Sequence, residues 1–242
     1  MVGHMNRVLR PLDIVGLEGP QWVDVTSDQL TQLPWSSVAQ VDVMEGTSVV
    51  SRGTAWLASQ HALVTAAHVV DLPRRPAEPR EIIVKFRSSN IDLIAEEIEV
   101  HSSYVFKGDS PYDLFDLAVI RINDTGLPSL KFSSQSIGQA QVELAGFPQW
   151  QTWTDHFVTH SGPMIRPNRD KNIILYQVDT KGGHSGAPVV VDSGSADAVV
   201  IGIHVQPFGG NPYSDIYPRH NVGLVLNQDL VTFIADNVRA WG

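Results

Sequence analysis

Short segments rich in Val, Ile and Leu recur at close intervals along most of the chain, separated by Gly, Pro, Asn, Asp and Ser. Segments of this kind are typical of β-strands, and a long succession of them favours a sandwich or a barrel over alternating strands and helices. The chain is therefore predicted to be all-β. The expected strands cover residues 38–44, 53–58, 62–66, 81–87, 92–100, 116–122, 141–146, 155–160, 172–179, 187–192, 198–205 and 221–227.

Two segments predict helices instead. An apolar stripe with helical spacing near the C-terminus predicts a helix over 228–240, with Asn227 as its N-cap. Near the other end, residues 26–29 (Thr-Ser-Asp-Gln) form a capping-box pattern, which predicts a short helix over 27–33. The C-terminal stripe consists of Leu230, Phe233, Ile234 and Val238.

The turn-rich residues 123–138 lie midway among the strands and are the expected connection between two β halves. We expect an N-terminal leader over 1–37 and a first half over 38–130. The second half would cover 131–242 and include the C-terminal helix. The loop 206–219 is long, and long loops in compact domains are usually functional.

The composition excludes several kinds of site. The chain has no Cys, which rules out disulfides, thiolate zinc sites, iron–sulfur clusters and a Cys nucleophile. Its 17 Lys and Arg against 26 Asp and Glu give a net charge of −9, which disfavours binding to nucleic acid or anionic membranes. No apolar run is long enough for a membrane span. The leader contains Gly3–Met5, typical of a cloning remnant, but no apolar signal-peptide segment, so we expect a cytoplasmic rather than a secreted protein.

Three local patterns supply residues that can do chemistry. His68 follows one predicted strand in Thr-Ala-Ala-His, Asp116 opens another in Asp-Leu-Ala-Val-Ile, and Ser185 lies in Gly-Gly-His-Ser-Gly-Ala-Pro. A serine hydroxyl becomes a good nucleophile when an imidazole takes its proton, and a carboxylate on the other ring nitrogen orients that imidazole. Glycines around the serine let backbone N–H groups face an oxyanion. Ser185 is therefore the predicted nucleophile, His68 the predicted base and Asp116 the predicted orienting acid.

In this order the three patterns resemble the signature segments of trypsin-like serine endopeptidases of the chymotrypsin fold. The order of the catalytic residues along the chain differs in two other families: the Ser comes first in α/β-hydrolases, and the Asp comes first in subtilisins. The order His, Asp, Ser therefore excludes both. The resemblance covers roughly residues 38–238 and implies two antiparallel six-stranded β-barrels with the active site in the cleft between them. It implies catalysis by His68 and Asp116 of the first barrel and Ser185 of the second. It also implies an oxyanion hole formed by the N–H groups of Gly183 and Ser185, a polypeptide substrate, and no cofactor or metal.

Within that family the chain is most similar to the bacterial glutamyl endopeptidase (V8-like) branch. It has no cysteines, and His184 rather than Asp precedes the serine. Its Ile201–His204 segment resembles the one whose His contacts an acidic substrate side chain in that branch, and Thr180 matches a Thr of the same pocket. The resemblance therefore implies cleavage after Glu, with Thr180 and His204 binding the substrate. The loop after His204 departs from the family pattern, which leaves the floor of the pocket open.

Several alternatives stay open. Asp113 is the second choice for the orienting acid. His156 and His160 have a spacing that could hold a metal on a helix, but they lie in a predicted strand without the Glu of a metalloprotease motif. Residues 14–16 (Ile-Val-Gly) resemble the cleaved terminus of a trypsin-like zymogen, although His184 replaces the Asp that would receive it. The rival functions are a protease that stays latent until a regulatory partner or companion domain orders the cleft, and a peptide-binding module that does not cleave.

Overall fold

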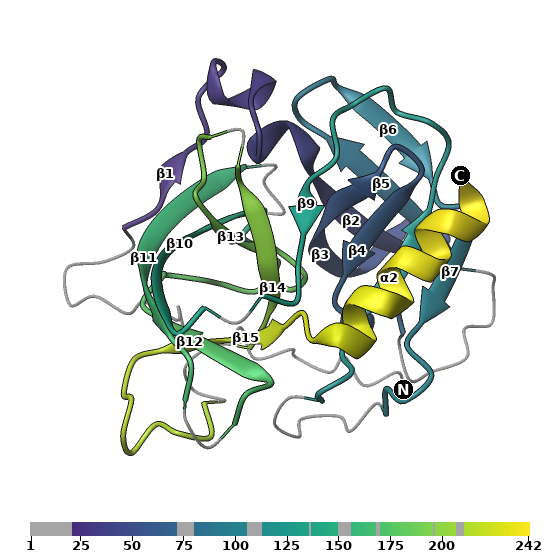
Figure 1. Cartoon of the computed structure of the whole chain (residues 1–242). Coiled ribbons are helices and arrows are strands. Elements are labelled where there is room, and N and C mark those ends of the chain that lie inside the picture. Colours follow the sequence, from purple (N-terminus) through teal and green to yellow (C-terminus); the bar gives the residue numbers. More distant parts are fainter. Residues whose placement is uncertain are drawn as a thin grey trace, which may run out of the picture.

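The computed structural model describes residues 21–71, 80–105, 113–135, 137–149, 156–167, 170–195, 197–206 and 211–242. Two β-sheets lie side by side, and one long helix runs along the outside (Figure 1). The first sheet contains β2 (Val38–Glu45), β3 (Ser48–Ser59), β4 (Ala62–Thr65), β5 (Arg80–Phe86), β6 (Ile91–Ile94), β7 (Glu97–Val100) and β8 (Ala118–Arg121). The second contains β1 (Val23–Asp24), β9 (Lys131–Phe132), β10 (Gln139–Gly146), β11 (Val158–Ile165), β12 (Ile173–Tyr176), β13 (Pro188–Val191), β14 (Val199–Gln206) and β15 (Asn221–Val225). The helices are η1 (Gln29–Thr31), η2 (Trp35–Ser37), α1 (Ala67–Val70) and α2 (Gln228–Trp241).

The first sheet has the strand order β6-β5-β2-β3-β4-β8-β7 and is antiparallel throughout. Its two end strands, β6 and β7, follow one another in the chain, because the predicted strand 92–100 divides at Ala95 and Glu96. The amide of Ala95 donates to Ile82 of β5 at 2.9 Å, and the amide of Glu96 donates to Arg121 of β8 at 2.9 Å. One bent segment therefore pairs with both sides of the sheet and curls it into an open barrel, in which the end strands β6 and β7 do not pair with each other.

Six strands of the second sheet form a closed ring, because β11 pairs with β10 on one side and with β12 on the other. Around the ring the order is β10-β13-β14-β15-β12-β11. Outside it, β1 pairs with β11, and β9 pairs in parallel with β14. The all-β prediction is confirmed, and β9 adds a short strand to the segment expected to be a plain connection.

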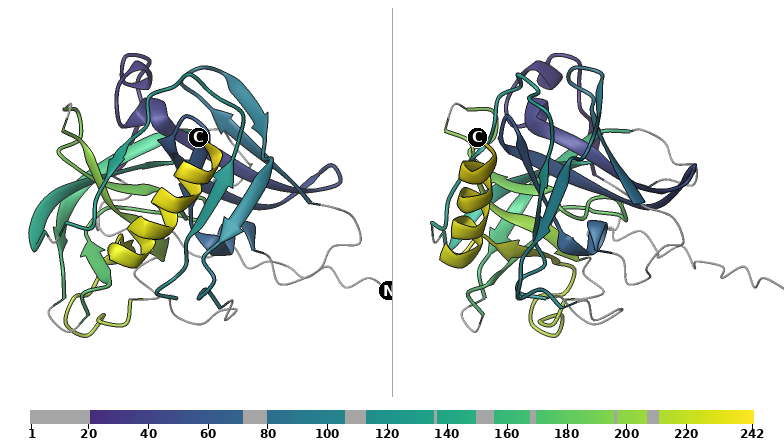
Figure 2. Two further views of the ribbon diagram at one scale, coloured as in Figure 1. Left: turned by 45° about the vertical axis from the view of Figure 1, so that its right-hand side comes forward. Right: turned by 90° about the vertical axis from the view of Figure 1, so that its right-hand side faces the viewer.

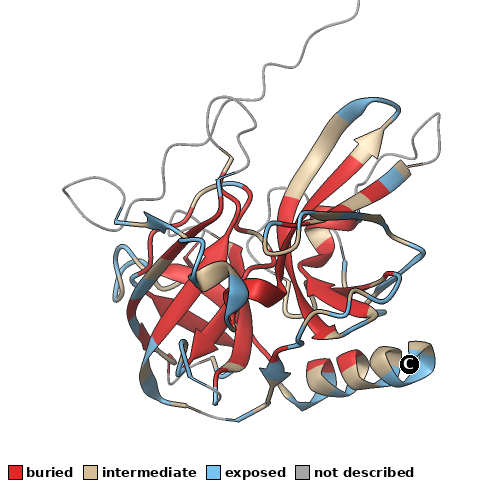
Figure 3. Ribbon diagram, turned by 90° about the horizontal axis from the view of Figure 1, so that it is seen from above, coloured by how far each residue is buried: buried red, intermediate tan, exposed pale blue. Residues whose placement is uncertain are grey.

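Much of the backbone of both sheets belongs to buried residues (Figure 3), and most of these are apolar. The largest fully buried ones in the first sheet include Trp56 and Phe86, and those in the second include Tyr176. Fully burying one large apolar side chain contributes about 1.5–3 kcal/mol, so the inward faces of the strands dominate the stability of each barrel.

Helix α2 confirms the prediction for 228–240. The side chain of Asn227 accepts a hydrogen bond from the amide of Leu230 at 3.0 Å, as an N-cap does. Leu230 and Ile234 are fully buried, and the helix packs on β3, β4 and β8 of the first sheet (Figure 2). Although α2 follows the last strand of the second sheet, it covers the first, so it ties the two halves together.

The predicted helix over 27–33 is wrong. The capping-box bonds do form: the amide of Thr26 donates to Gln29 Oε1 at 2.9 Å, and the amide of Gln29 donates to Thr26 Oγ1 at 3.3 Å. Only a single 3₁₀ turn, η1, follows them. Nucleating a helix is costly, and Pro34 ends the segment before enough turns can offset that cost. None of the helices in the described ranges is long and apolar enough to cross a membrane.

Candidate active site

His68 and Asp116 meet because they stand at the same end of two paired strands. Helix α1, which carries His68, starts two residues after the end of β4. Asp116 stands two residues before β8. Since β4 and β8 are antiparallel with Thr65 opposite Ala118, the end of one lies beside the start of the other.

Both oxygens of the Asp116 carboxylate hold His68. Oδ1 accepts the backbone N–H of His68 at 2.9 Å, and Oδ2 lies 2.6 Å from the ring Nδ1. A hydrogen bond from Nδ1–H to the carboxylate leaves Nε2 as the proton acceptor of the neutral ring. The Asp116 side chain is 7% exposed and that of His68 is 32% exposed, so the acid is buried behind an accessible imidazole. Asp113 instead accepts the amides of Val105 and Phe115, which makes it a loop-capping residue.

Ser185 lies in the turn Lys181–Ala187, where successive peptide carbonyls are held in place. Gly182 O accepts the amide of Gln149 at 2.6 Å. Gly183 O accepts the hydroxyl of Thr54 at 2.8 Å. His184 O accepts the amide of Ala187 at 2.8 Å. Because C=O and N–H point in opposite directions in a trans peptide, these bonds also set the directions of the amides in between.

The amides of Gly183 and Ser185 form no hydrogen bond with any residue that the structure describes. Gly183 has a φ of 100°, and a Cβ there would lie 2.2 Å from the carbonyl oxygen of Phe147, so only glycine fits. Two backbone donors next to one another, held by their neighbours and left without a partner, are what an oxyanion hole requires.

The serine turn packs directly on the residues that lead to His68. A Cβ on Gly53 would lie 2.7 Å or less from both Val69 methyl groups and 2.9 Å from the carbonyl oxygen of Ser185. A Cβ on Gly186 would lie 2.8 Å from the amide nitrogen of Ala66. The two glycines thus let the turn of the second barrel approach α1 of the first, which brings Ser185 beside the segment that carries His68.

His184, directly before Ser185, is buried. Its Nδ1 accepts the amide of Lys181 at 3.1 Å, and its ring packs against Trp22 with the centroids 5.9 Å apart. Burial lowers the pKa of His184 to about 4; the carbonyl oxygen of Lys181, 3.2 Å from Nδ1, opposes the shift, and His160 adds to it. His184 is therefore a neutral residue that helps to shape the turn.

Thr180 and His204 carry hydrogen-bonding atoms to which no described residue is bonded. The Thr180 hydroxyl is buried and has no hydrogen-bond partner in the described part of the chain, which is costly for a polar group unless a ligand satisfies it. The Tyr176 hydroxyl lies 2.6 Å from His204 Nδ1, and burial raises the pKa of Tyr176 well above its ordinary value. A buried O–H must donate, so Nδ1 accepts, and Nε2 carries the ring proton. Burial lowers the pKa of His204 well below its ordinary value, and His184 and His68 lower it further.

Sequence reasoning missed Asp179, an acid next to Thr180. Its buried carboxylate accepts the backbone N–H of Gln21 at 2.6 Å and lies 3.8 Å from Nδ1 of His160. The acidic residue was visible in the sequence, but its contact with Gln21 depends on the pairing of β1 with β11. The same segment places Trp22 on His184, so the residues next to β1 contact both Asp179, just before the serine turn, and His184 within it.

The predicted strand around His156 and His160 begins only at Val158, so the two histidines do not share a strand face. His156 lies 3.2 Å from Asp24, whereas His160 faces Asp179. Among the described residues, no three His, Asp or Glu side chains are grouped so that they could hold a metal ion. The Ile-Val-Gly segment 14–16 lies outside the described residues.

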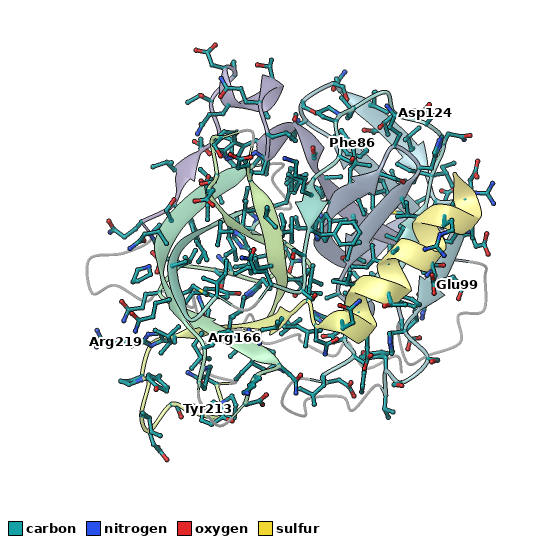
Figure 4. All side chains as sticks on the ribbon, in the orientation of Figure 1. Phe86, Glu99, Asp124, Arg166, Tyr213 and Arg219 are labelled. Atoms are coloured by element: carbon teal, nitrogen blue, oxygen red, sulfur yellow. The ribbon has the colours of Figure 1, made fainter. Side chains whose placement is uncertain are left out.

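The loop predicted over 206–219 is described from Asn211 onward. The side chain of Asn211 donates to Tyr217 O at 3.0 Å and to His220 O at 3.2 Å, and it accepts the amide of Tyr213 at 2.8 Å. Tyr213 and Arg219 lie on this loop at the edge of the second sheet, well away from Glu99 and Phe86 of the first (Figure 4).

The model of the trypsin-like peptidase domain matches residues 53–203, which include both halves of the site. The chain belongs to the trypsin-like peptidase family. No protein with a curated function matches this trypsin-like peptidase in sequence.

Solved structures resemble the trypsin-like peptidase over nearly its whole length. A Glu endopeptidase in complex with MPD is 19% identical with a TM-score of 0.72, covering 91% of this chain and 97% of that one. HL collagenase is 17% identical with a TM-score of 0.70, covering 91% and 99%. A serine endoprotease from Yersinia pestis is 19% identical with a TM-score of 0.58, covering 89% and 67%. At these identities the likeness concerns the fold alone, and it confirms the predicted chymotrypsin-like fold.

Proposed function

We propose that the protein is a serine endopeptidase in which Ser185 attacks the scissile carbonyl of a polypeptide. His68 takes the serine proton and later returns it to the leaving amine, while Asp116 holds the ring and stabilises its protonated form. The tetrahedral oxyanion accepts hydrogen bonds from the amides of Gly183 and Ser185. The observation that carries the proposal is the bond of His68 to Asp116 at 2.6 Å beside a serine turn with two unpartnered amides.

A fluorophosphonate probe tests the nucleophile. We expect it to label Ser185 in the wild-type protein and to leave Ser185→Ala unlabelled. That variant keeps the fold, because a small hydroxyl in a turn is removed, and it loses about 10³-fold or more in turnover. A wild-type protein that folds but neither reacts with the probe nor cleaves a peptide library would favour the peptide-binding module instead.

We further propose that the enzyme cleaves after Glu. The support is chemical: the Thr180 hydroxyl and the Nε2–H of His204 are both able to donate to a carboxylate. Hydrogen bonds to charged groups contribute about 1.5–3 kcal/mol each. The Asp179 carboxylate would oppose an acidic side chain at short range, but it is buried, accepts the amide of Gln21 and lies 3.8 Å from Nδ1 of His160.

Cleavage of a peptide library, read by mass spectrometry, tests the specificity separately from the nucleophile. We expect His204→Ala to reduce cleavage after Glu far more than it reduces labelling by the fluorophosphonate. Cleavage mainly after Arg, Lys or large apolar residues would refute the Glu preference and leave the proposed nucleophile unaffected.

A further inference from the structure

Thr54 of β3 is the residue of the first barrel that holds the serine turn of the second. Its backbone N–H donates to the carbonyl of Ser185 at 2.8 Å, and its hydroxyl donates to the carbonyl of Gly183 at 2.8 Å. The same hydroxyl accepts the amide of Phe147 at 3.2 Å. Because the buried hydroxyl both donates its proton and accepts a hydrogen bond, its direction is set.

The peptide unit that Thr54 holds lies between the two proposed oxyanion donors. The carbonyl of Gly183 belongs to the unit that joins it to His184, whereas the donating amides belong to the units on either side. The amide of His184 donates to Lys181 O at 3.0 Å, so the middle unit is fixed at both of its polar atoms. Rotation of this unit would turn one or both of its neighbours, and the amides of Gly183 and Ser185 would lose their common direction.

Close packing around Thr54 leaves its hydroxyl and its carbonyl little room to move. A Cβ on Gly146 would lie 3.0 Å from its hydroxyl, and a Cβ on Gly186 would lie 2.2 Å from its carbonyl. Thr65, just before the segment of His68, donates its own hydroxyl to the Thr54 carbonyl at 2.8 Å. Thr54 thus contacts the strand end that leads to the proposed base and the turn that carries the proposed nucleophile.

We propose, on the basis of the proposed function, that Thr54 is a positioning residue: its hydroxyl orients the oxyanion hole from the opposite barrel. The inference predicts that loss of the hydroxyl lowers the rate of the chemical step and leaves substrate binding nearly unchanged. A displacement of the donors on the order of 1 Å is expected to lower kcat about 10- to 100-fold.

The variant Thr54→Val removes the hydroxyl and keeps the shape of the side chain. We expect a lower kcat with KM nearly unchanged, and an equal loss of affinity for a peptide aldehyde built on the best substrate, because its tetrahedral adduct needs both amide donors. Thr54→Ser keeps the hydroxyl and should restore both quantities. If Thr54→Val does not fold, Thr54→Ala is used in its place. We expect it to show the same loss of kcat and of aldehyde affinity relative to Thr54→Ser.

Ser37→Ala is the matched control, because Ser37 is also fully buried and donates its hydroxyl to a backbone carbonyl, that of Pro128, at 2.5 Å. It should lower the melting temperature without changing kcat. An unchanged kcat and aldehyde affinity in Thr54→Val or Thr54→Ala, measured against a wild-type protein that the fluorophosphonate labels, would overturn the inference. A wild-type protein that is not labelled would instead refute the proposed function itself.

Discussion

At the scale of single residues, a buried carboxylate determines the orientation of the His68 ring. Asp116 receives both the backbone N–H and the ring nitrogen of His68, so its charge fixes the tautomer as well as the orientation of the ring. Asp113, three residues earlier, accepts the backbone amides of Val105 and Phe115 in its own loop. Two acids close together in the sequence therefore have different roles, and a pair of amide substitutions separates them.

Asp116→Asn should lower kcat by about 10⁴-fold, because an amide can donate to Nδ1 and favour the wrong tautomer. Asp113→Asn keeps an acceptor for the loop amides and should retain most of the activity. Both variants should unfold at nearly the wild-type temperature in calorimetry. Equal losses of activity in the two variants would contradict the assignment of Asp116.

At the scale of secondary-structure elements, α2 and β1 each tie one part of the chain to another. Helix α2 continues from the second barrel and buries Leu230 and Ile234 against the first. Phe233 of the same helix contacts His101 edge-on at 5.0 Å, and His101 stacks on Phe115, next to Asp116. The short strand β1 attaches to the second barrel and positions the residues beside the serine turn.

Ile234→Ala should lower the free energy of unfolding by about 2–5 kcal/mol, as expected when a fully buried aliphatic side chain leaves a cavity. Arg239→Ala is the control, because Arg239 is exposed and forms a surface ion pair with Asp236 of its own helix, at 3.1 Å. This variant should change the free energy of unfolding by no more than about 0.5 kcal/mol. Chemical denaturation of the two variants measures both values. A small effect of Ile234→Ala would mean that α2 contributes little to holding the two barrels together.

At the scale of the whole molecule, two buried neutral imidazoles lie at the serine turn: His184 within it, and His204, whose carbonyl accepts the amide of Gly186 at 2.8 Å. Burial lowers the pKa of both, and it also lowers the pKa of the half-buried His160 and His101. The rings of His184 and His204 contact each other edge-on, 6.5 Å apart. Protonating either one would place a charge where the folded protein can least accommodate it.

The stability of the protein should therefore fall in mild acid. The pKa of His184 is about 4 in the folded protein and 6.5 ordinarily, so between these values the unfolded chain binds the additional proton. This contribution is present in full above pH 6.5 and is lost as the pH falls toward 4. Each unit of difference between the folded and unfolded pKa is worth about 1.4 kcal/mol, so His184 alone should lower the free energy of unfolding by about 3 kcal/mol.

Denaturant unfolding measured from pH 7 down to pH 4 tests this expectation. His184→Gln should flatten the dependence of the unfolding free energy on pH, whatever its effect at neutral pH. An unchanged slope in His184→Gln would show that the acid sensitivity has another source.

The sequence by itself determined what depends on neighbours along the chain. The alternation of apolar runs and turn residues predicted the strands, and the stripe from Leu230 to Val238 predicted α2 with its N-cap Asn227. The motifs around His68, Asp116 and Ser185, in that order along the chain, predicted the trypsin-like peptidase family. The prediction of a helix over 27–33 was wrong, because a correct capping signal does not supply the length that a stable helix needs.

Only the tertiary structure decided which distant groups meet. Nothing next to Thr54 in the sequence distinguishes it from other strand threonines, yet it holds the carbonyls of Gly183 and Ser185 across the two barrels. In the same way, Trp22 covers His184, and Asp179 is occupied by the amide of Gln21. Hydrogen bonds of this kind join residues more than 120 positions apart, and the curling of the two sheets and the packing of one barrel on the other determine which pairs form.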